Sequence, residues 1–405
     1  MEVDSIKMQM EIVKDFSDKS EIEIKTGPFG TQLKASEYQS SGTPVLNVKN
    51  LGFSTINTEK LDMVGDATVE RLKAHLLKAG DIVFGRKGAV ERHAFISVNE
   101  EGWMQGSDCI RLRVKTDMIN PRFLSYYFLT KEHRAFMISM CSHGTTMASL
   151  NQKILEQICF PMPRRNVQDK IVHILERIDR KIVVNNRIND NLFEQMQVLY
   201  KAWFIDFLPF GGLKPGSWTQ TDIYSLADII YGAPFASKQF NTEGEGKPII
   251  RIRDLKNQQF ATYTTEVHPK GYLLQLGDIV VGMDGEFRPY IWGNDEAWLN
   301  QRVCVFENKR PSGKAFLYFT IKPLLYAIEQ TQVATTVIHI GKKDYDSFEI
   351  VLPDVSTLDS FDALTLPMVK QIVANSFENK RLVAMRDALL PKLMSGEIDV
   401  SAIQI

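Results

Sequence analysis

The sequence has few cysteines and no long apolar run. None of its four cysteines belongs to a Cys-x-x-Cys pair, so neither a zinc ribbon nor a dithiol redox motif is supported. No apolar run reaches the length of a membrane span, and residues 1–11 lack the apolar core of a signal peptide. We therefore expect a cytoplasmic protein whose four thiols are buried: Cys109, Cys141, Cys159 and Cys304.

Motifs that carry enzyme chemistry are also missing. The sequence has no GxxxxGK[ST] phosphate loop and no GxGxxG. It has no GxSxG elbow and no HExxH motif. The seven histidines are scattered, and no two have metal-ligand spacing on an obvious helix. The sequence therefore predicts a chain with no catalytic residue, no metal site and no cofactor of its own.

The chain also lacks an excess of charge of either sign. Its formal net charge is −1, with 48 basic and 49 acidic residues. Such a balance gives no overall attraction to nucleic acid. A DNA-binding role must then rest on local basic patches, or on partner subunits that bring more positive charge.

The most informative feature present is a duplication, in which six segments recur in the same order. The matched pairs are Thr43–Leu51 with Lys247–Leu255, Leu77–Gly85 with Leu274–Gly282, Asn99, Trp103 and Cys109 with Asn294, Trp298 and Cys304, Phe123–Leu124 with Phe316–Leu317, Thr145–Thr146 with Thr335–Thr336, and Phe160–Pro163 with Ile350–Pro353. Because the period is far longer than a solenoid unit, each copy is expected to be a domain.

Each copy carries short β-rich runs punctuated by glycine and proline, such as Asp81–Phe84 and Cys109–Val114. A helix is predicted from Phe123 to Met140, with Pro121 just before it. This mixture indicates an α+β module.

A different pattern follows Pro163. No glycine or proline occurs from about Val167 to Phe207, and apolar residues alternate spacings of four and three. That alternation is typical of a coiled-coil seam, and about 40 helical residues would form a rod near 60 Å long. The seam residues are Ile171, Leu175, Ile178, Ile182, Asn185, Asn189, Leu192, Met196, Leu199 and Trp203.

The second copy ends in the same seam, formed by Met368, Ile372, Asn375, Asn379, Leu382, Arg386, Leu389 and Leu393. Two seamed helices in one chain are expected to pair with each other. In an antiparallel pair, Asn185 would face Asn379 and Asn189 would face Asn375, and these polar layers would set the register. Pro391 is expected to bend or fray the second helix, which would make it the shorter of the two.

The predicted fold class is α+β: two mixed α/β domains, each followed by a long helix, with the helices pairing as an antiparallel coiled coil. The predicted boundaries place the first domain at residues 1–163 and its helix at 164–210. The second domain follows at 211–353 and its helix at 354–405.

Several loops carry side chains suited to DNA. Arg86, Lys87, Arg92 and His93 lie on a glycine-bounded turn after a strand, where arginine can contact guanine and lysine can contact phosphate. A solvated basic turn is the plain alternative. The equivalent turn carries Asp284, Arg288 and Tyr290 instead, so the two copies should favour different bases.

Hydroxyl-rich loops and further basic residues complete the set of candidates. His143, Thr145 and Thr146 lie in one such loop, and Thr335, Thr336 and His339 lie in its counterpart. These loops are equally consistent with ordinary turns. The weaker basic candidates are Lys34, Lys49, Asn50, Arg251, Arg253 and Lys256.

Taken in order, these segments resemble the specificity subunit (HsdS) of type I restriction–modification systems, over essentially the whole chain. The residues that carry the resemblance are Ile24–Leu33, Pro44–Val48, Ala79–Val83, Gly144, Leu150, Ile154, Ile158, Pro163, Tyr200–Phe207 and Leu389–Ile398. One departure is Ala334, which stands where the first copy has Gly144.

The resemblance implies that each module is a target-recognition domain for one half of a bipartite double-stranded DNA site. It also implies that the helices set the spacing and dock two HsdM methyltransferase subunits, which bind S-adenosylmethionine. HsdR restriction subunits would add translocation that uses ATP and Mg. The candidates for partner docking are Tyr200, Trp203, Phe204, Phe207, Leu389 and Leu393. The alternative for the four aromatic residues is that they close the helices against the modules.

Three other readings stay open at this point. The chain could be a stand-alone two-headed DNA-binding regulator, which would bind its site without partners. It could be an inactive scaffold or an antirestriction mimic. The enzyme reading would require a methyltransferase motif such as Asn-Pro-Pro-Tyr, which is absent.

Overall fold

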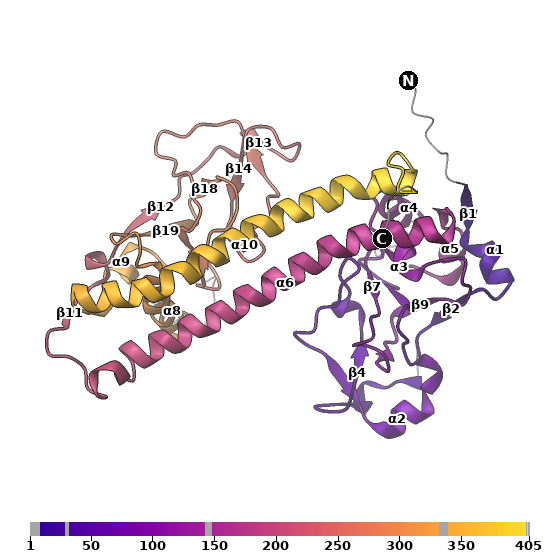
Figure 1. The fold of residues 1–405 in the computed structure, drawn as a ribbon, viewed down its shortest axis with the longest axis horizontal. Helices are drawn as coiled ribbons and strands as arrows, with labels where there is room; N and C mark the ends of the chain where they lie inside the picture. Colours follow the sequence, from indigo (N-terminus) through magenta and orange to yellow (C-terminus); the bar gives the residue numbers. More distant parts are fainter. Residues whose placement is uncertain (1–8, 29–31, 142–147, 332–338, 402, 404–405) are drawn as a thin grey trace. The chain divides into compact units, whose positions relative to one another are not determined.

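The computed structural model describes residues 9–28, 32–141, 148–331, 339–401 and 403. These residues form two compact units (Figure 1). The first contains residues 1–179 and 384–405, and the second contains residues 180–383. Each unit therefore contains one module together with one end of both long helices. Among the described helices, none is both long enough and apolar enough to cross a membrane.

The first module is a mixed α/β domain (Figure 1). Its strands are β1 Met10–Ile12, β2 Ile22–Thr26, β3 Tyr38–Gln39, β4 Thr43–Leu46, β5 Asp62–Val64, β6 Ile82–Gly85, β7 His93–Phe95, β8 Met104–Gln105, β9 Cys109–Val114 and β10 Cys159–Pro161. Its helices are α1 Val13–Asp18, α2 Asp66–Arg71, α3 Pro121–Tyr127, α4 Lys131–Cys141 and α5 Gln152–Glu156. The long helix α6, Arg165–Phe204, follows this module.

The second module has β11 Thr219–Asp222, β12 Ala227–Tyr231, β13 Phe240–Asn241, β14 Lys247–Ile250, β15 Tyr263–Thr264, β16 Ile279–Gly282, β17 Pro289–Ile291, β18 Trp298–Leu299, β19 Val303–Asn308 and β20 Glu349–Leu352. Its helices are α7 Ile252–Leu255, α8 Lys314–Thr331 and α9 Lys342–Tyr345. The second long helix, α10, spans Val355–Ser395.

Strand order confirms the duplication. The first module has sheets ordered β2-β9-β6-β7, β3-β5-β4-β8 and β1-β10. The second has β12-β19-β16-β17, β13-β15-β14-β18 and β11-β20, which is the same order strand for strand. In both modules one pair is parallel, β4 with β8 and β14 with β18, while the other pairs are antiparallel. The prediction of two mixed α/β modules is therefore confirmed.

The strand register shows that one pair of matched segments was aligned one residue out of step. Gly85 lies opposite Cys109 in the first module, and the equivalent Gly282 lies opposite Val303 in the second. Cys304 is therefore the counterpart of Ile110 rather than of Cys109. The two cysteines lie one position apart in equivalent buried strands. Matching them in the sequence therefore paired residues that are not equivalent in the backbone.

Burial of the thiols follows the prediction at three positions. Cys109, Cys141 and Cys304 are buried, and burial raises the pKa of the Cys141 thiol to about 11. Cys159 is exposed, which contradicts the expectation for that residue. It lies on β10 next to the buried Phe160, and neighbouring side chains of a strand point to opposite faces.

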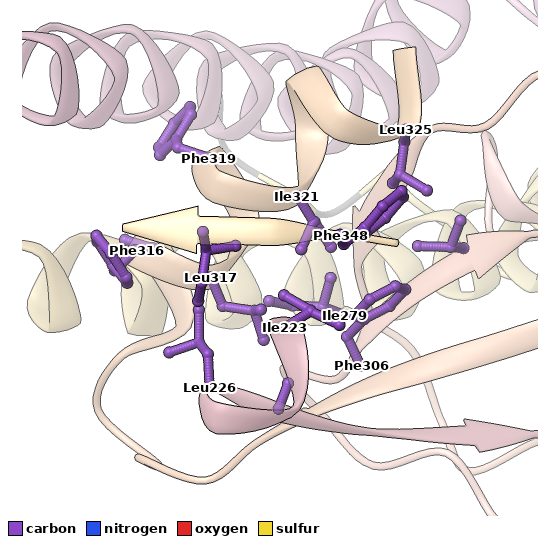
Figure 2. Close-up of a cluster of buried hydrophobic side chains, with 14 of the residues drawn as sticks. Ile223, Leu226, Ile279, Phe306, Phe316, Leu317, Phe319, Ile321, Leu325 and Phe348 are labelled. Atoms are coloured by element: carbon purple, nitrogen blue, oxygen red, sulfur yellow. The ribbon is translucent and has the colours of Figure 1, made fainter. Parts of the chain in front are cut away.

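The core of the second module is a large apolar cluster between sheet and helices. In Figure 2, Leu317 and Ile321 of α8 lie above Ile279 and Phe306 of the sheet. Burial of such side chains stabilises a fold by roughly 1.5–3 kcal/mol each. The matched pairs Phe123–Leu124 and Phe316–Leu317 are buried in both modules, which explains why they recur.

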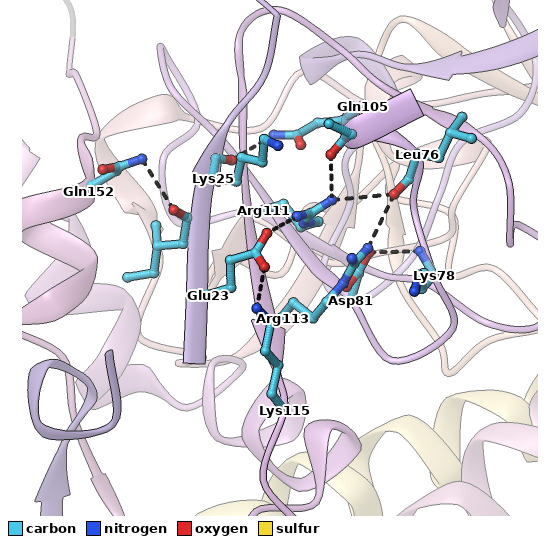
Figure 3. A network of polar contacts seen from close by, with 12 residues as sticks. Glu23, Lys25, Leu76, Lys78, Asp81, Gln105, Arg111, Arg113, Lys115 and Gln152 are labelled. Carbon is cyan, nitrogen blue, oxygen red and sulfur yellow. Dashed lines mark hydrogen bonds and ion pairs between the residues drawn. The ribbon is translucent and has the colours of Figure 1, made fainter. Parts of the chain in front are cut away.

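The sheet of the first module contains a charged network around Arg111 and Arg113 (Figure 3), in which only the Lys115–Glu23 pair has an equivalent among the described ion pairs of the second module, Lys309–Asp228. Arg111 is 1% exposed and pairs with Glu23, while Arg113 donates to Asp81 at 2.6 Å. The register places the apolar Val305 at the position equivalent to Arg111. Asp81 and its counterpart Asp278 both accept a backbone N–H in the preceding turn. The repeated Gly-Asp motif therefore builds a turn.

The prediction of one helix from Phe123 to Met140 is wrong, because the segment forms two. α3 ends at Tyr127 and α4 begins at Lys131. The Thr130 hydroxyl accepts the backbone N–H of His133 at 3.3 Å, which caps the new helix. In the second module the corresponding segment is one helix, α8, with Pro323 inside it.

The two long helices pair antiparallel through the predicted seam, as the prediction required. Within the second unit, Asn185 Nδ2 donates to Asn379 Oδ1 at 2.8 Å, and Asn375 Nδ2 donates to Asn189 Oδ1 at 2.9 Å. Within the first unit, Arg386 contacts Asp179 at 3.1 Å. Residue numbers rise along α6 while those of the partners fall along α10, so the helices are antiparallel. The predicted asparagine layers are confirmed.

The prediction that Pro391 shortens the second helix is wrong. α10 has 41 residues and α6 has 40. Pro391 is exposed, so water can reach the backbone carbonyl that loses its partner. Its neighbours Leu390 and Leu393 are buried against Ile171 and Leu175 of α6. That packing offsets the roughly 3 kcal/mol that proline costs inside a helix.

Two histidines are part of the first module's interior. His93 is fully buried, and its Nε2 lies 3.0 Å from the Ser125 hydroxyl. His133 is 2% exposed, with its ring 4.5 Å from that of Phe128. Burial lowers the pKa of each histidine to about 3. Both imidazoles are therefore neutral in the folded protein near neutral pH.

The asparagine layers lead to a stability prediction. Replacing Asn185, Asn189, Asn375 and Asn379 together by leucine should raise the free energy of unfolding in urea, because buried amides are exchanged for apolar contacts. Replacing Asn185 alone should lower it by about 1–3 kcal/mol, because Asn379 loses a hydrogen-bond donor. Faster hydrogen exchange in α6 and α10 of the quadruple variant would report a looser register. Destabilisation of the quadruple variant by several kcal/mol would contradict this role.

The buried histidines predict a loss of stability in acid. A histidine whose folded pKa lies below its ordinary value of 6.5 contributes stability above that value, and the contribution is lost as the pH falls toward 3. At about pH 5 the loss is about 2 kcal/mol for each histidine. Between about pH 7.5 and about pH 5, the free energy of unfolding of the wild type should fall by about 2 kcal/mol more than that of His133→Phe. Parallel pH profiles would contradict the prediction.

Candidate DNA interface

A β-hairpin of the first module carries the predicted basic turn, and this turn is called the first tip. β6 and β7 pair antiparallel, and the turn from Arg86 to Arg92 connects them. The segment that precedes α5 lies along this turn: Leu150 N donates to Arg86 O at 2.8 Å, and Gly88 N donates to Ala148 O at 3.1 Å. The basic turn and the end of the hydroxyl-rich loop, predicted separately from the sequence, are thus neighbours.

The second module has the same construction. β16 and β17 form the hairpin, and Ile340 N donates to Met283 O at 2.9 Å. Asp284 and His339 form an isolated antiparallel bridge, as Lys87 and Ser149 do in the first module. Gly88 and Gly285 have φ near +78° and +77°, so each turn uses a conformation that favours glycine.

The first tip is basic. Lys87 and Arg92 are exposed, and Arg86 is half-buried. Within the part of the chain that the structure describes, these three side chains form no ion pair with an acid. Their positive charges are therefore available to an anionic ligand such as a DNA backbone.

The second tip is a network of paired charges. The Asp284 carboxylate lies 2.7 Å from His339 Nδ1 and 3.3 Å from Arg302 Nη1. Arg288 pairs with Glu329 on α8, and Nη2 donates to Oε1 at 3.0 Å. Arg302 was not among the residues predicted from the sequence; its carbonyl accepts the N–H of Met283 at 2.9 Å. Its position directly before β19, across from the turn, was the available signal.

The other predicted basic residues lie on the surface in different settings. Lys34, Arg253 and Lys256 are exposed. Lys49 pairs with Asp62 at 2.7 Å, so its charge is partly compensated. The Arg251 guanidinium lies 4.8 Å from the centre of the Phe240 ring. Tyr290, on β17, is half-buried, and burial raises the pKa of its hydroxyl.

Two of the predicted DNA contacts are wrong, because the side chains are buried. Asn50 is 2% exposed, and its amide donates to the carbonyls of Asn57 and Lys60 at 2.9 and 3.2 Å. His93 lies inside the module against Phe84 and Phe128. Each polar side chain completes internal contacts that the sequence did not reveal. The predicted residues His143, Thr145, Thr146, Thr335 and Thr336 lie outside the described residues, as do Gly144 and Ala334.

The predicted docking residues are mostly part of the protein's own cores. Phe204 is 9% exposed and lies 4.8 Å from the rings of Phe316 and Phe361, while Leu393 is 1% exposed. A role as an open docking surface is therefore wrong for Phe204 and Leu393. The other four are partly buried: Tyr200, Trp203 and Phe207 against the core of the second unit, and Leu389 against that of the first.

Comparison with known families now adds to this geometry. A family model described as "Type I restriction modification DNA specificity domain" matches residues 22–194 and 215–374. The first matched stretch contains the first module from β2 onward, and the second contains the whole of the second module, each with its hairpin. The match therefore covers both copies of the duplicated unit.

Individual relatives agree with the family match. The type I restriction enzyme EcoBI specificity subunit of Escherichia coli is 36% identical over 141 residues, which span 35% of this chain and 30% of that subunit's length. The HindI specificity subunit of Haemophilus influenzae is 23% identical over 433 residues, covering 87% of this chain and 92% of that protein.

A solved structure shows the same fold. The S subunit of the type I restriction–modification system from M. genitalium has a TM-score of 0.56 and 14% sequence identity, with 99% of both chains covered. Specificity subunits are the non-catalytic DNA-recognition components of type I systems. The chain belongs to the type I restriction modification DNA specificity family and is a specificity subunit with two such domains.

Proposed function

We propose that each module reads one half of a bipartite double-stranded DNA sequence through its hairpin tip. The observation that carries this proposal is a shared scaffold with different tips. Arg86 and Lys87 follow the strand in the first module, whereas Met283 and Asp284 follow it in the second. Because base edges differ in donors and acceptors, different side chains at equivalent positions favour different half-sites.

The paired helices are proposed to set the distance between the half-sites. Two amide layers at one point of the seam fix a single register, since a shift would leave buried amides without partners. A fixed register gives a fixed unread gap in the DNA. The proposed boundaries are residues 1–163 and 211–353 for the recognition domains and 164–210 and 354–405 for the spacer helices.

The helices are also proposed to dock two HsdM methyltransferase subunits, with HsdR subunits completing the restriction complex. Val184, Ile188 and Val198 lie on one face of α6 and are 48%, 40% and 67% exposed. Exposed apolar side chains of this kind suit contact with a partner helix better than the buried Phe204 does. S-adenosylmethionine would be bound by the HsdM partner, and ATP and Mg by the HsdR partner.

Methylation mapping tests the proposed function. DNA from cells with the chain and its methyltransferase partner should carry methylated adenines in one bipartite motif, and deletion of the chain should abolish them. Specific binding by the purified chain alone, without any change in methylation, would favour a stand-alone DNA-binding regulator instead. An unchanged methylation pattern would count against the proposal.

A change in helix length tests the spacing role. Inserting one heptad at matched positions of α6 and α10 lengthens the pair by about 10 Å, which equals about three base pairs of DNA. The methylated motif should then keep both half-sites and gain about that many unread pairs. Insertion into α6 alone is the control, since it separates Asn185 from Asn379. Altered half-sites in the matched variant would contradict the spacing role.

A further inference from the structure

An exposed aromatic ring next to the first hairpin carries two arginines. Phe53 is 38% exposed, although it is large and apolar. The Arg92 guanidinium lies 5.7 Å from the centre of its ring, and the Arg134 guanidinium lies 4.4 Å from it. Arg92 ends the hairpin turn and Arg134 comes from α4, so the ring gathers cations from two separate elements. Each contact is within cation–π range.

These two positive charges lack acidic partners. In the described part of the chain, neither Arg92 nor Arg134 forms an ion pair. Arg122 is different, because its guanidinium lies 3.6 Å from both Glu176 and Asp179. Two like charges held beside one ring repel each other unless an anion lies close by. The arrangement therefore suits an anionic ligand from outside the protein.

The second module has a different contact at the position equivalent to Arg92. His93 is the first residue of β7 and Pro289 is the first of β17, so the preceding Arg92 and Arg288 are equivalent. Arg288 forms an ion pair with Glu329 on α8. In the first module, α4 places the cation of Arg134 over the Phe53 ring that Arg92 also contacts. In the second module, α8 places the anion of Glu329 against Arg288. The uncompensated charge is specific to the first module.

We propose that Arg92 and Arg134, held by Phe53, contact the phosphate backbone of DNA, and that the second module has no such contact at the equivalent position. The proposal rests on the proposed DNA-reading function and adds Phe53 and Arg134 to its surface. Phosphate is favoured over a base edge because the two neighbouring guanidiniums repel each other, and the negative charge of a phosphate offsets that repulsion whereas a neutral base edge does not. Phosphate contacts give affinity without sequence information.

Salt dependence distinguishes this role from a structural one. Each phosphate contact that is lost lowers the slope of log K against log salt concentration by about 1. The variants are Arg92→Gln, Arg134→Gln and their combination. Lys14→Gln is the control, since Lys14 is an exposed lysine on α1 paired with Asp18 and its loss changes the net charge equally. Thermal unfolding confirms that each variant is folded.

Binding should be measured on the full chain with its methyltransferase partner. Two fluorescent duplexes are needed, one of mixed sequence and one with the motif found by methylation mapping. Each arginine variant should weaken binding to both duplexes similarly, lower the salt slope by about 1, and leave the methylated motif unchanged. Phe53→Leu should weaken both affinities in the same direction, and Lys14→Gln should match the wild type.

Two results would overturn the proposal. One is an unchanged salt slope in the folded double variant. The other is a loss of binding confined to the motif duplex, which would assign the arginines to base recognition. Failure of the wild-type complex to bind either duplex would instead reject the proposed function, and the phosphate contact with it.

Discussion

The antiparallel pairing of α6 and α10 is the contact on which the rest of the structure depends. Its apolar seam continues into the cores of both units: Leu175 and Leu393 lie in one cluster, and Met196 and Ile372 lie in another. Because these clusters also contain residues of the modules, the helix register and the module packing are coupled. The paired asparagines make that register selective, since a shifted pair would bury amides without partners.

The duplication preserves backbone geometry more strictly than side-chain chemistry. Ten strands of one module have ten counterparts in the other, in the same sheet order. The polar interior changed nevertheless: Arg111 pairs with Glu23 in the first module, while Val305 occupies the equivalent position in the second. A buried arginine paired with a partly exposed glutamate and a buried valine can both complete a sheet, provided that the charged group has its partner.

The two tips, in contrast, differ in the charges at their surfaces. Among the residues that the structure describes, the cations of the first tip form no ion pair, whereas the second tip pairs its cations with Asp284 and Glu329. This difference explains how a chain with a net charge of −1 can include a basic surface suited to DNA. The turn from Arg86 to Arg92 contains three basic residues and one acid, Glu91, so a positive potential can be local although the whole chain is balanced.

The sequence alone determined the duplication, the seam and the asparagine pairs, because these depend on regular spacing along the chain. It also determined which strands recur, through Gly-Asp-Ile-Val and Pro at equivalent positions. Tertiary structure decided what spacing cannot express. Thr130 caps a second helix where one helix was predicted. Packing of Leu390 and Leu393 keeps α10 helical past Pro391. The side chains of His93 and Asn50 are buried although they were predicted to lie on the surface. Likewise, Arg134 and Phe53 lie far from Arg92 in the sequence and meet it only in the folded chain. Burial and the meeting of distant side chains are properties of packing, and only the folded chain establishes them.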